Sequence, residues 1–252
     1  MKVALQLYTV RDKMKVDYIS TLRAVADVGY KYVEFAGHPF MSIDVLDLKK
    51  FLNEIGIKPI SAHVGFNDLE NRFNEIISYA KSLGLKYLVS EPDVREISSL
   101  NECLKITEKM NKIGKKVDDN GLRFGVHNHA IEFNKKFDGK TVYNIFVENT
   151  DPSLVFFQPD VYWIKYAGYD PVKVIEKLEN RCFLVHLKDM KDEVSKDMIE
   201  LGQGILNFKD IVKACEKAGT EYYIVENDRP SMDSIISVKK ALEYLKENFE
   251  IE

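Results

Sequence analysis

Short apolar runs alternate with longer amphipathic runs along the whole chain. The short runs have the length of buried strands, and the longer ones repeat apolar residues at helical spacing. Eight strands are expected, over residues 3–10, 32–36, 59–64, 87–90, 123–126, 154–157, 182–187 and 222–225. Eight helices are expected between and after them, over residues 18–28, 43–55, 68–83, 99–119, 142–148, 171–180, 207–218 and 231–249.

Glycine, proline and capping residues support these boundaries. Gly29 and Gly84 directly follow two of the helices, where glycine commonly ends a helix. Asn67 or Asp68 is available to cap the third helix, and Pro171 suits a first helical turn.

This alternation predicts parallel strands joined by right-handed crossovers. Eight such units in 252 residues favour a closed α/β barrel, a single (β/α)8 TIM barrel, over an open sheet. An open sheet would need a switch point, and no glycine-rich phosphate loop marks one. No proline- or serine-rich linker interrupts the pattern, so we expect one barrel domain over residues 1–252.

Composition and charge exclude several classes of protein. The chain is 45% hydrophobic and 30% charged, as in ordinary soluble proteins. A net charge of −4 gives no basic surface for nucleic acid or anionic membranes. No segment approaches the ~18 apolar residues of a membrane span, and no signal-type block opens the chain. Three widely spaced cysteines are typical of reduced thiols. A cytoplasmic protein is therefore expected, with neither nucleic acid nor membrane as a partner.

Polar side chains stand at the ends of the expected strands, where a barrel collects its catalytic groups. They are Gln6, Glu34, His63, Glu91, His127, His129, Asp160, His186 and Glu226. The segment 124–133 is the most concentrated, because a buried strand leads directly into two histidines, an amide and a carboxylate.

Four of these strand-end segments supply candidate ligands for one divalent metal ion. We expect convergence of Glu132, Asp160, His186 and Glu226. Three carboxylates and one imidazole suit Mn²⁺ best, with Co²⁺, Mg²⁺ and Zn²⁺ as alternatives. Clustered carboxylates also repel one another unless a cation lies among them. The competing interpretation is that all four are solvated loop residues, which most charged side chains are.

The remaining rim residues have more than one interpretation. In an extended segment His127 and His129 point to the same side, so each could bind the metal, a sugar hydroxyl or a transferred proton, or be structural. Lys188 should face the same side as His186 and could neutralise an enolate. His63 and Gln6 could contact substrate or support the structure. Glu34 and Glu91 could belong to ion-pair networks beneath the site. Strand-end aromatics could form an apolar wall for a sugar ring: Tyr8, Phe35, Phe66, Phe133, Tyr162 and Trp163.

The chain resembles the sugar phosphate isomerase/epimerase family of xylose isomerase-like TIM barrels, which includes D-tagatose 3-epimerase and inosose dehydratase. The motifs that carry the resemblance are residues 5–12 (LQLYTVRD), 61–63 (SAH), 127–133 (HNHAIEF), 185–189 (VHLKD), 201–204 (LGQG) and 225–227 (VEN). The resemblance implies one metal held by Glu132, Asp160, His186 and Glu226, with the two glutamates exchanging a proton. This chain departs from the epimerase pattern at the fifth strand, because epimerases have a glutamate at the strand end where this chain has His127.

The expected function is a metal-dependent isomerase or epimerase that moves a proton next to the carbonyl of a keto sugar through an enediolate. Its expected catalytic residues are Glu132, Glu226, His129 and Lys188, and its expected substrate-binding residues are His63, His127, Gln6 and Trp163. A lyase or dehydratase acting on an inosose or 3-keto glycoside is the alternative, because a histidine could protonate a leaving hydroxyl.

More remote alternatives are an abasic-site endonuclease and a non-catalytic sugar-binding protein. A phosphorylated substrate is not indicated, because no arginine cluster follows strands seven and eight. Gly202 and Gly204 could nevertheless leave backbone amides free for a phosphate. A homo-oligomer is left open.

Overall fold

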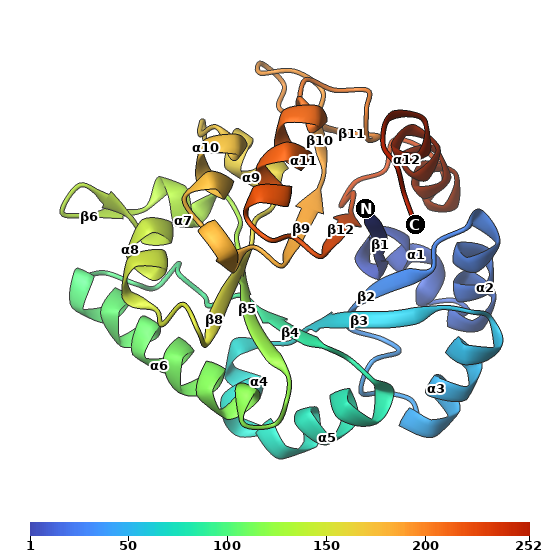
Figure 1. Ribbon diagram of the computed structural model, residues 1–252, viewed down its shortest axis with the longest axis horizontal. Coiled ribbons are helices and arrows are strands. Elements are labelled where there is room, and N and C mark those ends of the chain that lie inside the picture. The colour runs from blue at the N-terminus through green and yellow to red at the C-terminus, as the bar shows by residue number, and fades with distance from the viewer.

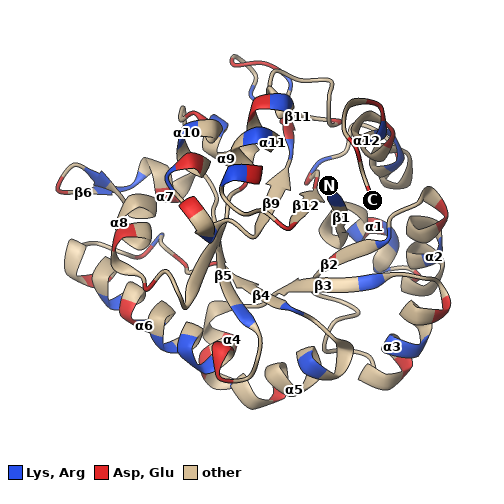
Figure 2. Ribbon diagram, viewed as in Figure 1, with Lys and Arg blue, Asp and Glu red and all other residues tan.

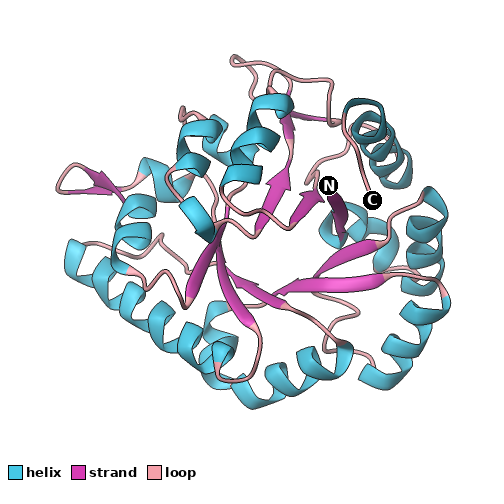
Figure 3. Cartoon of the chain, viewed as in Figure 1, coloured by secondary structure: helices cyan, strands magenta, loops and turns pink.

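Eight parallel strands form the inner wall of a barrel in the computed structural model, which describes residues 1–252 (Figures 1 and 3). They are β1 (Lys2–Gln6), β2 (Tyr32–Ala36), β3 (Lys58–His63), β4 (Tyr87–Ser90), β5 (Arg123–His127), β8 (Val155–Gln158), β9 (Leu184–Leu187) and β12 (Tyr222–Val225). Their order is β8-β5-β4-β3-β2-β1-β12-β9. A bridge from Asp160 to His186 joins the two outer strands, where His186 N donates to Pro159 O at 2.9 Å. The expected TIM barrel is confirmed.

Helices surround this wall, and charged residues of both signs lie along them (Figure 2). The longer ones are α2 (Tyr18–Val28), α3 (Val45–Glu54), α5 (Phe73–Leu83), α6 (Leu100–Asp118), α8 (Val142–Asn149), α11 (Phe208–Lys217) and α12 (Ser234–Asn248). The shorter ones are α1 (Arg11–Met14), α4 (Phe66–Asn71), α7 (Ile131–Asn134), α9 (Val161–Tyr166) and α10 (Pro171–Glu176), with 3-10 turns at Leu7–Val10 and Glu179–Arg181. Two small hairpins complete the fold: β6 (Lys136–Phe137) with β7 (Lys140–Thr141), and β10 (Asp189–Met190) with β11 (Met198–Ile199).

Helix boundaries follow local chemistry. Asp17, Ser99 and Asp233 each accept a backbone N–H at the start of α2, α6 and α12. Gly29 ends α2 with φ of +111°, a conformation that residues with a Cβ rarely adopt. No helix is both long and apolar enough to cross a membrane.

Three local expectations were wrong. The first strand ends at Gln6, because its side chain accepts from Tyr8 N and starts a 3-10 turn. The helix expected over 68–83 is divided at Arg72, and the first part is capped by Gly65 rather than by Asn67 or Asp68. Residues 161–166, where no helix was expected, form α9 directly after β8.

An apolar layer inside the barrel supports the polar groups at the strand ends. Its buried members are Ala4, Ile60, Tyr87, Val89, Phe156, Leu184 and Ile224. Side chains alternate along a strand, so the residue two positions further on faces the same interior. On β9, Leu184 therefore precedes His186, and on β12 Ile224 precedes Glu226. Gly125 leaves room for the Phe156 ring, because a Cβ there would lie 2.3 Å from it.

Candidate active site

A cavity of about 1140 Å³ opens at the C-terminal ends of the strands. Seven of the residues expected at the site line it: Gln6, His63, His127, His129, Trp163, Lys188 and Glu226. Asp160 and His186 are fully buried next to it. Tyr8 and Tyr162 also line the cavity, whereas Phe35, Phe66 and Phe133 are core residues.

Three of the four expected metal ligands lie together. The nearest ligand atoms of Asp160, His186 and Glu226 are within 4.8 Å of one another. His186 Nδ1 lies 2.7 Å from Glu226 Oε2 and 3.9 Å from Asp160 Oδ2. These residues come from consecutive strands of the barrel, so the topology itself brings them to one point.

Asp160 presents one carboxylate oxygen to this group. Its Oδ1 accepts from the backbone N–H groups of Tyr162 and Trp163, at 3.0 and 3.1 Å, and so caps α9. Its Oδ2 is buried and accepts no hydrogen bond of acceptable geometry. A buried acceptor without a hydrogen bond is costly, and the cation that offsets this cost in the structure is the Lys188 ammonium, 2.9 Å from Oδ2.

His186 is held from both sides. Its Nδ1 faces Glu226, and its Nε2 lies 2.6 Å from Glu34 Oε1. Burial lowers the pKa of His186, but the two carboxylates outweigh burial and raise it to about 9. Burial likewise opposes ionisation of Glu34 and Glu226, yet the neighbouring cationic groups hold both pKa values below the usual range. A carboxylate behind an imidazole is the usual support for a metal-binding histidine.

Lys188 places a buried ammonium among the carboxylates. Its Nζ lies 2.9 Å from Asp160 Oδ2, 2.8 Å from Glu226 Oε2 and 3.0 Å from Asp228 Oδ1. Burial lowers the pKa of Lys188, but these three carboxylates raise it well above its ordinary value. Lys188 therefore faces the same side as His186, as alternation along the strand predicted.

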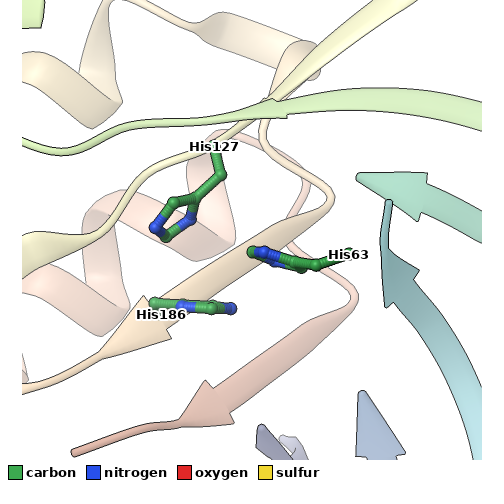
Figure 4. Close-up of side chains that lie close together, drawn as sticks. All are labelled: His63, His127 and His186. Carbon is green, nitrogen blue, oxygen red and sulfur yellow. The ribbon is translucent and has the colours of Figure 1, made fainter. Parts of the chain in front are cut away.

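Gln158 sets the orientation of two further imidazoles. Its Nε2 donates to Glu34 at 2.9 Å, so its Oε1 faces His63 Nε2 at 2.8 Å and His127 Nδ1 at 3.1 Å. His127 thus keeps a free Nε2 lone pair, 3.8 Å from Asp160 Oδ2. Burial and the neighbouring imidazoles hold the pKa of His127 well below its usual value. Figure 4 shows His63, His127 and His186 facing one another from three strands.

Glu132 belongs neither to the group formed by Asp160, His186 and Glu226 nor to any other group of potential metal ligands at the site. The chain turns into α7 after His129, and the Glu132 carboxylate folds back to accept from His129 N at 2.8 Å. The side chain is buried and does not line the cavity. Burial raises the pKa of Glu132 to about 7.

His129 instead pairs with Glu91. His129 Nδ1 lies 3.5 Å from Glu91 Oε2, and the other Glu91 oxygen lies 3.2 Å from His63 Nδ1. His127 and His129 do point to the same side, with ring centroids 5.2 Å apart. Asn128 points away, and its Oδ1 accepts from Asp160 N at 3.1 Å.

Several residues of the site were not singled out from the sequence. Gln158 ends a strand, and this position could have marked it. Asp228 follows Glu226 by two residues, the same spacing that placed Lys188 beside His186.

The amides of Gly202 and Gly204 are not free for a phosphate, because both donate to Asp189, at 3.0 and 2.9 Å.

The fold and site together define a xylose isomerase-like barrel. The profile of the xylose isomerase-like TIM barrel family matches residues 22–248, and the chain belongs to this family. The expected resemblance is therefore confirmed.

Individual relatives carry two kinds of name. Inosose dehydratase of Clostridium beijerinckii is 24% identical over 221 residues, which are 79% of this chain and 67% of that protein. Inosose dehydratase of Geobacillus kaustophilus is 28% identical over 199 residues, 69% of this chain and 62% of that protein. A sugar phosphate isomerase/epimerase from Parabacteroides distasonis superimposes with a TM-score of 0.86 at 25% identity, covering 98% of this chain and 94% of the other. An IOLI protein whose crystal structure contains a zinc atom shares the fold, with a TM-score of 0.77 at 18% identity and 99% of both chains covered.

Proposed function

We propose that this protein is a divalent-metal-dependent isomerase or epimerase that transfers a proton next to the carbonyl of a keto sugar or related polyol. The observation that carries the proposal is the convergence of Asp160, His186 and Glu226 on one point beside the cavity. The relatives named as sugar isomerases, epimerases and dehydratases support an enzyme that acts on sugars.

The donor set fits a divalent ion. Asp160 Oδ2 accepts no hydrogen bond, although Lys188 Nζ lies 2.9 Å away. The contact of His186 Nε2 with Glu34 leaves His186 Nδ1 facing Asp160 and Glu226. We assign the strand-five ligand to His127 rather than Glu132, because His127 Nε2 is free and lies 3.8 Å from Asp160 Oδ2. Two carboxylates and two imidazoles suit Mn²⁺, Co²⁺ or Zn²⁺. A bound ion would supply Lewis-acid stabilisation of negative charge on the substrate carbonyl oxygen.

The side chains divide the proton transfer between them. Glu226 faces the cavity as a carboxylate and takes the proton from the carbon next to the carbonyl. The C–H electron pair becomes the C=C bond of an enediolate, and the carbonyl oxygen gains the negative charge. Lys188 holds a positive charge 2.8 Å from Glu226. This charge favours the build-up of negative charge on the carbonyl oxygen. Return of the proton from Glu226 to the adjacent carbon completes isomerisation. Epimerisation needs a second acid that protonates the other face, and His129, which lines the cavity, is the candidate.

Sugar positioning falls to the polar and aromatic lining. His63 and Gln6 line the cavity next to the fully buried Glu34 network and offer polar groups to hydroxyls. Trp163 and Tyr8 offer apolar surfaces to the faces of a sugar ring.

A dehydratase is the second candidate, and the pairing of His129 with Glu91 favours it. In that reaction Glu226 removes the same proton, and the enediolate electron pair expels the hydroxyl on the next carbon. His129, 39% exposed in its side chain and facing the cavity, would protonate that hydroxyl so that it leaves as water. Glu91 would orient the imidazole, as a carboxylate behind a catalytic histidine does.

Solvent deuterium incorporation tests the shared step. The protein would be incubated in D2O with Mn²⁺ and, separately, with a ketose, an inosose and a 3-keto glycoside. NMR should detect deuterium at the carbon next to the carbonyl, and mass spectrometry should separate isomerisation from loss of water. Metal-dependent turnover of any of these without deuterium at that carbon would contradict the proposal.

Two glutamate variants provide a matched comparison. Glu226→Gln should abolish deuterium incorporation because it removes the base. Glu132→Gln should retain most of it, because Glu132 does not line the cavity. If Glu132→Gln loses exchange and metal as completely as Glu226→Gln does, Glu132 is the strand-five ligand after all.

A further inference from the structure

The mouth of the cavity carries four cationic side chains that have no carboxylate partner. Arg11, Lys191, Lys196 and Arg229 line the cavity, and none of them lies within 4.0 Å of a carboxylate. Lys188, the remaining Lys or Arg side chain of the cavity lining, is paired with three carboxylates. Asp197 is the one carboxylate of the 191–199 loop that lines the cavity.

Two of these cations are fixed in place rather than loose on the surface. The Arg11 guanidinium donates to Tyr8 O at 2.8 Å and Asp228 O at 2.7 Å, and lies 4.0 Å from the centre of the Tyr8 ring. Lys196 Nζ donates to Tyr166 O at 2.8 Å. Both positive charges are therefore held at the cavity with no carboxylate in direct contact.

The loop that carries Lys191 and Lys196 is tied down on both sides. Tyr162 OH donates to Lys196 O at 2.7 Å, which joins the loop to α9. At the other end, Glu200 accepts from Ser231 N at 3.0 Å and from Ser231 Oγ at 2.7 Å, which joins it to the segment after β12. Arg229 lies in that same segment, and Arg11 is joined to it through its hydrogen bond to Asp228 O.

The cavity thus combines carboxylates and imidazoles at the strand ends with four cations from the segments beyond them, to which the 191–199 loop adds the single carboxylate Asp197. A neutral sugar would contact only the carboxylates and imidazoles at the strand ends and would leave the four cations without a partner. We propose that the substrate carries an anionic group, a carboxylate or a phosphate, at the end remote from the reacting carbonyl, and that Arg11, Lys191, Lys196 and Arg229 bind it. This inference rests on the proposed sugar site and names the substrate class. It departs from the expectation that no phosphate is indicated, because Lys191, Lys196 and Arg229 follow the seventh and eighth strands even though no cluster of arginines does.

The test measures binding, so it does not depend on turnover. Trp163 is the only tryptophan and lines the cavity, so its fluorescence, together with calorimetry, can report binding. The Mn²⁺-treated protein would be titrated with D-fructose, D-fructose 6-phosphate, D-fructuronate and inorganic phosphate. We expect either or both anionic sugars to bind about tenfold or more tightly than fructose, as two or more charge-assisted contacts predict. Inorganic phosphate alone should bind, and more weakly at high salt.

The variant Lys191→Ala with Arg229→Ala removes the two cations that make no side-chain hydrogen bond. It should lose the preference for anionic sugars and most phosphate binding, with fructose binding unchanged. Lys105→Ala with Lys112→Ala, two exposed lysines on α6, is the control of equal charge. The proposal is overturned if phosphate does not bind, or binds both variants as tightly as the unaltered protein. Failure of deuterium exchange with intact phosphate binding would instead count against the proposed reaction alone.

Discussion

Glu34 is the residue on which most of the inner site depends. It is fully buried and accepts hydrogen bonds from Gln6 Nε2 at 2.8 Å, Ser61 Oγ at 2.6 Å and Gln158 Nε2 at 2.9 Å. Its Oε1 also lies 2.6 Å from His186 Nε2. The Glu34 carboxylate therefore orients the His186 imidazole directly. It orients the His63 and His127 imidazoles through Gln158.

Glu34→Gln should weaken metal binding roughly 10- to 100-fold, the usual effect of removing a supporting carboxylate. The pKa of His186 should also fall, because one of the two carboxylates that raise it is gone. Calorimetric titration with Mn²⁺ and NMR titration of the imidazole would measure the two effects. Unchanged metal affinity would show that Glu34 has only a structural role.

Glu132 should make stability depend on pH. Its folded-state pKa is about 7 against 4.5 for an ordinary glutamate, because it is buried. The folded state therefore binds the proton more tightly, so stability is greatest below pH 4.5 and is lost as pH rises to about 7. Glu132→Gln should consequently match the unaltered protein near pH 4.5 and exceed it at pH 8, by about 3 kcal/mol at most.

Urea unfolding at both pH values, with metal removed, would measure the difference. Glu132→Asp keeps the charge and serves as the control. A variant Glu132→Gln that is less stable at pH 8 than the unaltered protein would contradict this account of the residue.

At the scale of elements, the direction of side chains at the strand ends could be predicted from the sequence. The turns that follow the strands could not. Asp160, His186 and Glu226 could be predicted to converge because each lies at or just beyond the end of an apolar strand in a parallel barrel. Glu132 could not be placed this way, since it lies five residues beyond the strand end and α7 intervenes. Glu34 and Gln158 lie 124 positions apart in the sequence, and no local sequence pattern reveals the contact between them.

The loop after β9 is organised by one carboxylate. Asp189 accepts from the backbone N–H groups of Gly202, Gly204, Leu206 and Met190. A Cβ at Gly204 would lie 2.2 Å from Met190 O and 2.3 Å from Asp189 Oδ1, too close for any real contact.

Gly204→Ala should therefore cost about 1–3 kcal/mol in the free energy of unfolding, as overpacking does. It should also loosen the segment 191–199, which limited proteolysis would detect. Gly139→Ala serves as a control for backbone strain without a clash, because φ is +79° there and a Cβ would meet nothing within 4 Å. Equal protease resistance of Gly204→Ala and the unaltered protein would mean that Asp189 does not hold the loop.

For the whole molecule, metal binding and protonation should be linked. His186 with a pKa of about 9 contributes stability that is complete below about pH 6.5 and is lost as pH rises through 9. A metal ion must displace the proton on His186 Nδ1, so metal affinity should rise with pH over the same range. Calorimetry at pH 7 in buffers of different ionisation enthalpy should detect release of about one proton per ion. Release of no proton would mean that His186 is not a ligand.

A crystal grown with Mn²⁺ gives the most direct test of the central claim, through anomalous scattering. The predicted result is one strong anomalous peak within coordination distance of Asp160 Oδ2, His186 Nδ1 and Glu226 Oε2. His127 Nε2 should be the fourth protein ligand. A crystal with no peak between these three atoms, or with these atoms too far apart to share an ion, would contradict the account.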